Sequence, residues 1–209
     1  MNINPPVRPN QAINRLLETL EPYATPMSVV ARKRLTPNYK GKAQLYLLKK
    51  GELSIIRSSD KLLIVTVYEP HLFGVAEILQ PSHSHALRAE VASEVLRIDS
   101  EQAIKLFREH NLWEEVTRLL AYHTSYLVYR DDLVLQQRTY SVIRNHLLEM
   151  LLLPQETRLR VSILEYIQDR THLSRSSILN VLSALKKGGY IEFARGGYLQ
   201  SVSSLPEKF

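Results

Sequence analysis

The first hundred residues switch from a helical to a strand-like pattern of apolar positions. Near the N-terminus the apolar residues recur every three or four positions, as on one face of an amphipathic helix: Ile13, Leu16, Leu17 and Leu20. Between residues 35 and 98 they form short β-prone runs instead, at 45–48, 53–56 and 62–68, separated by turn-forming residues. The stretch 85–99 alternates well enough for two further strands. This spacing predicts an antiparallel sandwich or roll.

A long helix is predicted next, with apolar-weighted positions in alternating steps of four and three. The 3.5-residue period over three heptads is that of a coiled-coil seam, which predicts a partner helix. The predicted seam residues are Trp113, Val116, Leu120, His123, Leu127, Arg130 and Val134. The alternative is that this stripe packs on the chain's own β-rich segment, although a second stripe could do that: Leu112, Leu119, Tyr126 and Leu133. We expect both contacts, with one face on the roll and one on a second subunit.

The C-terminal third has the pattern of two short helices and a hairpin. A helix over residues 140–152 ends before Pro154, and a short apolar-patterned helix follows at 163–167. After a four-residue break, Ser174 is the expected N-cap of a helix whose two faces differ. One face is apolar (Ile178, Val181, Leu182, Leu185), and the other is polar (Arg175, Ser176, Asn180, Ser183, Lys187). Two glycines at 188–189 and a strand–turn–strand pattern at 190–202 complete a predicted winged helix-turn-helix.

The polar face of that second helix has the side chains that read DNA. A helix N-terminus attracts phosphate, and the hydroxyls of Ser174 and Ser177 can bind it. An arginine such as Arg175 can contact guanine O6 and N7, and Asn180 can contact adenine N6 and N7. The full set of candidate DNA-binding residues is Ser174, Arg175, Ser176, Ser177, Asn180 and Arg195. The alternative is an ordinary serine cap with a solvated face, in a regulator that works through protein contacts without specific DNA binding.

Composition narrows the class of protein. The chain has 209 residues, 44% hydrophobic and 23% charged, which is typical of globular domains. With no cysteine, disulfides, thiolate metal sites, thiol redox switches and cysteine-ligated clusters are excluded. No apolar stretch approaches the length of a membrane span, so we expect a cytoplasmic protein with a short flexible N-terminal arm. Residues 138–209 carry a net charge of +4 and residues 61–137 one of −4, which favours a polyanionic partner for the C-terminal third.

Three segments of this sequence resemble the CRP/FNR family of bacterial transcription regulators. The segment "LYLLKKGELSII" (45–56) is similar to the opening of the family's β-roll, and "LFGVAEILQPSHSHALRAEVASEVLRID" (72–99) to its phosphate-binding cassette and following strand. The most specific match is "LSRSSILNVLSALKKGGYIE" (173–192), which resembles the family's recognition helix, with Ser174, Arg175, Leu182, Leu185 and Ile191 in step. The resemblance covers roughly residues 45–202.

The resemblance implies an α+β fold: an antiparallel β-roll like that of cyclic-nucleotide-binding domains, a long dimerisation helix and a C-terminal winged helix-turn-helix. The corresponding domains are residues 1–110, 111–137 and 138–209. It also implies a homodimer on a palindromic site in double-stranded DNA, with RNA polymerase as a further partner. Arg175 would be the base-reading arginine, whereas Ser176 stands where members often carry a base-contacting glutamate. His172 stands in the turn where glycine is usual.

The cassette departs from the cyclic-nucleotide-binding pattern. Family members that bind cyclic AMP use Gly-Glu for the ribose and Arg-Ser for the phosphate, but here Gly74 precedes Val75, and His83-Ser84 aligns with Arg-Ser. A largely neutral histidine is a poor replacement for a bidentate guanidinium, so we expect no tight binding of cyclic AMP. The site is either filled by side chains or holds a less charged, more apolar effector. The candidate pocket residues are Phe73, Gly74, Glu77, His83, Ser84, Leu87 and Tyr126.

An enzyme alternative comes from "HSHALRAE", where His83, His85 and Glu90 follow a spacing like that of cupin metal ligands. Two imidazoles and a carboxylate would suit iron, manganese or nickel. Glu90, however, would need a bulge to share a strand face with the two histidines, and a cupin would not account for the winged helix. We therefore expect a regulator without enzymatic activity, cofactor or metal, and regard the cupin-like enzyme as the weaker alternative.

Overall fold

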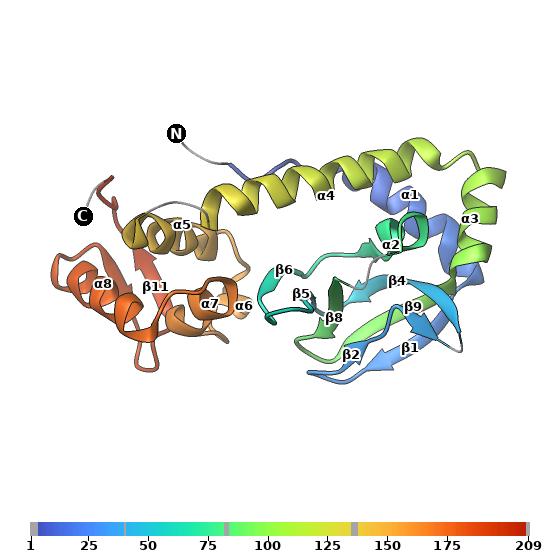
Figure 1. Ribbon diagram of the computed structural model, residues 1–209. Coiled ribbons are helices and arrows are strands. Elements are labelled where there is room, and N and C mark those ends of the chain that lie inside the picture. Colours follow the sequence, from blue (N-terminus) through green and yellow to red (C-terminus); the bar gives the residue numbers. More distant parts are fainter. Residues whose placement is uncertain (1–3, 40, 82–83, 135–137, 208–209) are drawn as a thin grey trace. The chain divides into compact units, whose positions relative to one another are not determined.

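The computed structural model describes residues 4–39, 41–81, 84–134 and 138–207 (Figure 1). The chain divides into two compact units, an N-terminal unit of Pro5–Leu127 and a C-terminal unit that holds Val128–Phe209. The division falls inside one long helix, α4 (Trp113–Val134), whereas the predicted boundary near Gln137 lies outside the described residues. No helix in the described ranges is both long enough and apolar enough to cross a membrane.

Two antiparallel sheets form the N-terminal unit. In the larger sheet the strand order is β1 (Thr25–Val29), β9 (Ser93–Asp99), β4 (Lys42–Lys50) and β3 (Asn38–Tyr39), and β7 (His71–Phe73) also pairs with β4. In the smaller sheet the order is β2 (Arg34–Leu35), β8 (His85–Ala89), β5 (Leu53–Arg57) and β6 (Leu63–Val67). Every apolar run that the sequence marked as a strand overlaps one of these strands, so the antiparallel β-rich domain is confirmed.

Helices cover one face of the larger sheet (Figure 1). They are α1 (Asn10–Leu20), α3 (Ser100–Glu109) and the first part of α4; the shorter helices of the unit are η1 (Glu21–Tyr23) and α2 (Val75–Leu79). The predicted N-terminal helix is therefore confirmed as α1. Its four apolar residues Ile13, Leu16, Leu17 and Leu20 are all buried in the core that it shares with α3, α4 and the sheet.

Strand β4 has buried side chains on both of its faces. Leu45 and Leu47 pack in the core formed with the helices, whereas Tyr46 and Leu48 belong to a second core that contains residues of both sheets. Successive side chains of a strand point to opposite faces, so the run 45–48 supplies both cores at once. This double burial places β4 between a helical layer and the smaller sheet.

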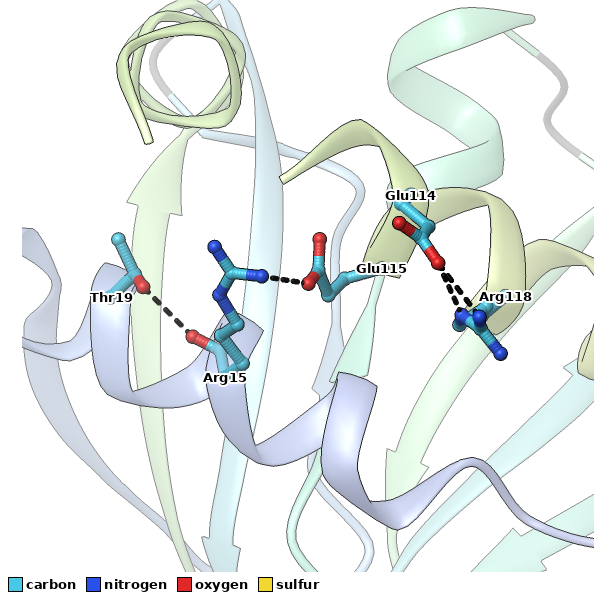
Figure 2. Close-up of polar contacts among 5 residues, drawn as sticks. All are labelled: Arg15, Thr19, Glu114, Glu115 and Arg118. Carbon is cyan, nitrogen blue, oxygen red and sulfur yellow. Dashed lines mark hydrogen bonds and ion pairs between the residues drawn. The ribbon is translucent and has the colours of Figure 1, made fainter. Parts of the chain in front are cut away.

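An ion pair fastens α1 to α4 at the start of the long helix (Figure 2). The Arg15 guanidinium of α1 donates to the carboxylate of Glu115, whose side chain is buried and whose second oxygen, Oε2, has no hydrogen-bond partner among the described residues. One residue earlier, Glu114 receives hydrogen bonds from Arg118 at 3.1 and 2.7 Å, but both of these side chains face solvent. The two pairs therefore differ mainly in burial.

Two histidines join the sheet to the long helix further along α4. His71 of β7 and His123 of α4 are 52 positions apart in sequence, and their Nε2 atoms lie 3.0 Å apart. One ring must donate and the other accept, so the pair holds a single Nε2 hydrogen between two neutral imidazoles. Burial lowers the pKa of His123 from 6.5 to about 4. Burial, together with His123 and Arg8, holds the pKa of His71 well below its usual range.

The C-terminal unit is a small helical domain with a two-stranded hairpin. Its elements after α4 are α5 (Thr139–Leu151), α6 (Gln155–Arg158), α7 (Ile163–Arg170), α8 (Arg175–Lys187), β10 (Ile191–Phe193) and β11 (Leu199–Val202). One apolar core joins α5, α7, α8 and the hairpin, with Ile143, Leu147, Ile167, Ile178 and Leu199 fully buried. The predicted helix, turn, helix and hairpin are thus confirmed in their predicted order.

We predict that Arg15→Met lowers the free energy of unfolding by ~1–3 kcal/mol, because it leaves the buried Glu115 carboxylate without a cation. Arg118→Met is the matched control, since its pair with Glu114 is exposed; it should change stability by no more than ~0.5 kcal/mol. Chemical denaturation of both variants measures the difference. Equal losses for the two variants would show that burial of Glu115 does not matter.

A second prediction concerns acid stability. The imidazoles of His71 and His123 bind protons more weakly in the folded chain than in the unfolded chain, so their contribution to stability is complete above about pH 6.5 and declines as the pH falls towards 4. His123→Gln removes one of these groups and should reduce the stability lost between pH 7 and pH 5. The exposed His110→Gln is the control. Unfolding curves at the two pH values give the comparison, and an unchanged loss in His123→Gln contradicts it.

Candidate functional site

Hydrogen bonds fix both ends of α7, the helix that precedes the turn to α8. A capping box opens α7, in which the Ser162 hydroxyl accepts from the Glu165 backbone N–H at 3.2 Å and the Glu165 carboxylate accepts from the Ser162 N–H at 3.1 Å. Past the end of α7, the buried Thr171 hydroxyl donates to the Ile167 carbonyl at 2.8 Å. The backbone at His172 has a negative φ, so this turn does not need the glycine that is usual there in the CRP/FNR family.

Three hydroxyls gather at the start of α8. The Ser174 hydroxyl accepts the Ser177 backbone N–H at 3.1 Å, and its oxygen lies 3.0 Å from Ser176 Oγ and 2.8 Å from Ser177 Oγ. Ser174 is therefore the N-cap that the sequence predicts. The remaining N–H groups of the first turn and the positive end of the helix dipole lie beside these hydroxyls, an arrangement that suits an anion.

The rest of α8 separates a buried stripe from an exposed polar face. Ile178, Leu182 and Leu185 are at most 5% exposed and pack in the C-terminal core. Arg175 and Asn180 lie on the exposed part of the helix, and within the described ranges neither side chain has a hydrogen-bond or ion-pair partner. The remaining polar residues of the face are also exposed: Ser176, Ser183 and Lys187. A guanidinium and an amide are thus available to a ligand.

The hairpin after α8 forms the wing. Strands β10 and β11 pair antiparallel, and two glycines with positive φ, Gly196 (95°) and Gly197 (82°), make the turn beside the exposed Arg195. The Gly197 carbonyl accepts the Ile163 N–H at 2.9 Å, so the tip of the wing is tied to the start of α7. Phe193 of β10 lies under the ammonium of Lys186 at 4.2 Å, which joins the wing to the end of α8.

One residue of this face was missed by the sequence reasoning. Leu179 of α8 is 42% exposed, although leucines in a short amphipathic helix usually lie in the core. Its position one turn after Arg175 was the available signal, because residues four apart share a helix face.

The candidate effector residues mostly serve the packing of the β-domain. Phe73 is buried in the core that contains residues of both sheets, and Leu87 packs against that core. Gly74 has a φ of 94°, and a Cβ there would lie 2.8 Å from the Gln44 carbonyl oxygen, so this position needs glycine for backbone reasons. His83 lies outside the described residues. The exposed Ser84 hydroxyl lies 3.0 Å from His85 Nδ1.

Two further candidate residues, Glu77 and Tyr126, are both half-buried. The arginine that follows the His83-Ser84 pair in the sequence is Arg88. Arg88 forms an ion pair with Glu90 at 2.8 Å. Glu90 is also the carboxylate of the cupin-like motif, so that carboxylate is already paired with Arg88. Among the residues that the structure describes, no cluster of three histidine, aspartate or glutamate side chains could hold a metal ion. An apolar effector near Phe73 and Leu87, with Tyr126 as a pocket wall, stays a prediction.

The predicted seam of the long helix meets two different surroundings. Val116 is 1% exposed in the core of the N-terminal unit, His123 contacts His71, and Arg130 is buried in the C-terminal unit. These three positions are therefore occupied within the chain, because its own core residues fill the space around them. Trp113 (37%) and Leu127 (47%) are exposed, as the seam requires, and Leu120 is half-buried. The side chain of Val134 lies outside the described residues.

Comparison with known proteins agrees with this architecture. A family model described as winged helix-turn-helix DNA binding matches residues 139–207, which contain α5 to β11. Two solved structures share the fold over most of the chain. The c-di-GMP-responsive global regulator CLP of Xanthomonas campestris is 17% identical, with 91% of this chain and 100% of that chain covered and a TM-score of 0.75. A CRP-family transcriptional regulator from Thermus thermophilus is 19% identical, with 80% and 88% covered and a TM-score of 0.61.

A curated relative extends the likeness to the sequence of the whole chain. The Salmonella typhimurium protein named inhibitor of hydrogen peroxide resistance is 30% identical over 205 residues, which cover 97% of this chain and 98% of that protein. The β-rich domain, the long helix and the C-terminal helix-turn-helix also agree with the resemblance found in the sequence. The chain therefore has the CRP/FNR regulator fold and belongs to the family of this Salmonella protein.

Proposed function

We propose that this chain is a sequence-specific DNA-binding transcriptional regulator that acts as a homodimer and is not controlled by cyclic AMP. The observation that carries the proposal is the exposed face of α8, where Arg175 and Asn180 have no partner within the described ranges and lie next to a helix N-terminus. A regulator bound near a promoter acts on RNA polymerase, which is the protein partner that we propose.

Each part of this face has a distinct role in the proposal. The first turn of α8, with Ser174 and Ser177, would contact a phosphate and position the helix in the major groove. Arg175 would read a guanine and Asn180 an adenine, because their hydrogen-bonding groups match those base edges. Arg195 at the wing tip would contact the phosphate backbone, where a cation contributes affinity but no base specificity. Ser176 is too short to reproduce a base-contacting glutamate, so the preferred site should differ from those of relatives that carry one.

The homodimer is proposed from the free face of α4. We propose a seam that differs from the predicted one by one residue at alternate positions: Trp113, Thr117, Leu120, Thr124 and Leu127, which still follow steps of four and three. Thr117 and Thr124 are exposed, and their hydroxyls donate to the Trp113 and Leu120 carbonyls at 2.7 and 3.0 Å. Their hydrogen bonds are thus satisfied within the helix, so they can pack against a second copy without an unpaired polar group.

The lack of cyclic AMP control is proposed from the side chains of the cassette. Phe73 and Leu87 lie in or against the β-domain core, and the carboxylate that the ribose would need is absent after Gly74, where Val75 stands. Arg88 is engaged by Glu90 and is not free for a phosphate.

The name of the Salmonella relative links that protein to hydrogen peroxide resistance. We propose that the genes controlled by this chain affect the same property. The chain contains no cysteine, so such a link would act through the regulated genes and not through oxidation of a thiol in the regulator.

Selection of binding sites from random duplexes tests the DNA-binding proposal. Arg175→Ala should lower affinity for the selected site by ~1–3 kcal/mol per half-site and relax the preference at one base position, because one bidentate base contact is lost. Arg195→Ala is the comparison variant; it should weaken binding to all sequences and reduce the salt dependence. If Arg175→Ala binds the selected site as tightly as the parent, Arg175 does not read a base.

Calorimetric titration tests the absence of cyclic AMP control. We expect no saturable binding of cyclic AMP at micromolar concentrations and no change in the affinity for the selected duplex when the nucleotide is added. Tight binding, or a nucleotide-dependent gain in DNA affinity, would contradict the proposal.

A further inference from the structure

Leu179 is an apolar side chain on the polar side of α8. Leu179 is 42% exposed. The three residues of the buried stripe are at most 5% exposed: Ile178, Leu182 and Leu185. Its exposure therefore does not follow from loose packing of the helix. The helix presents one leucine to the outside while its core stripe is complete without it.

The position of Leu179 on the helix places it among the residues proposed to read DNA. With about 100° of rotation per residue, Arg175 and Asn180 are separated by about 140° around the helix, and Leu179 falls inside that arc. Ser176 and Ser183 fall there too, and both have short side chains. Leu179 is thus the bulkiest apolar group between the guanidinium and the amide.

We propose that Leu179 contacts the 5-methyl group of a thymine in each half-site, an inference that rests on the proposed DNA-binding function. The thymine 5-methyl is the one methyl group that base edges present in the major groove, where they otherwise offer mainly hydrogen-bond donors and acceptors. A leucine brought against those polar groups would remove them from water without replacing their hydrogen bonds. Contact with a methyl group instead buries apolar surface on both sides.

The geometry also places this thymine relative to the guanine read by Arg175. Leu179 lies about one helical turn after Arg175, which is an axial rise of about 6 Å. Base pairs are stacked about 3.4 Å apart, so the thymine should lie within about two base pairs of that guanine. The selected half-site should therefore contain a thymine at this short spacing, on either strand.

Replacing thymine by deoxyuridine tests the inference, because it removes only the methyl group. In the selected duplex, each thymine is replaced in turn in both half-sites, and the dissociation constant is measured for the full-length protein. One replacement should weaken binding by about fourfold per half-site, the factor expected for one buried methyl group. For Leu179→Ala the same replacement should have no effect, and the binding of this variant to the unmodified duplex should be weaker than that of the parent.

Leu159→Ala is the matched control, since Leu159 is similarly exposed (47%) in the same unit but lies outside α8. It should keep the parent's affinity and the parent's sensitivity to deoxyuridine. The inference is wrong if the parent binds a selected site through Arg175 but binds thymine and deoxyuridine equally well at every position. It is also wrong if Leu179→Ala still distinguishes thymine from deoxyuridine. In both cases the proposed function stands. If no sequence is enriched in the selection, the proposed function fails and the inference fails with it.

Discussion

Burial of the apolar stripe of α8 determines which side chains the C-terminal unit can present to a ligand. Ile178, Leu182 and Leu185 are held in a core with α5, α7 and the hairpin. A helix has 3.6 residues per turn, so once this stripe is buried, the outward direction of every other side chain follows. Arg175 and Asn180 are free because the core needs neither of them. The wing depends on the same packing, since Leu199 of β11 belongs to that core and the Gly197 carbonyl binds the start of α7.

One face of the long helix α4 packs on the N-terminal unit, and its opposite face is exposed. Glu115, Val116 and His123 each contact another element of the N-terminal unit, through an ion pair, apolar packing and an imidazole hydrogen bond. These contacts hold the helix against the β-domain over about two turns. Thr117 and Thr124, which directly follow Val116 and His123, are exposed, and their hydroxyls are hydrogen-bonded within the helix. A helix that is already fixed on one side loses little conformational entropy when its other side pairs with a second copy, which favours the proposed dimer.

The sequence predicted local patterns well and long-range contacts poorly. The alternation in the β-rich region and the two-faced α8 were recognisable because strand and helix periods differ. Val116 and Thr117 both suit a 3.5-residue period, so the sequence could not tell which of them packs within the chain; the structure buries Val116 in the core of the N-terminal unit and leaves Thr117 exposed. The pairing of His71 with His123 has no local signal, since the residues come from distant elements. Leu179 was missed because an apolar residue in an amphipathic helix is normally a core residue.

In the proposed complex, two copies each place the start of α8 in the major groove of one duplex. The most direct measurement combines selection from random duplexes with the mass of the resulting complex in solution. We predict an inverted repeat whose half-site centres are about 10 base pairs apart, bound by two chains. A single unrepeated site bound by one chain would contradict it.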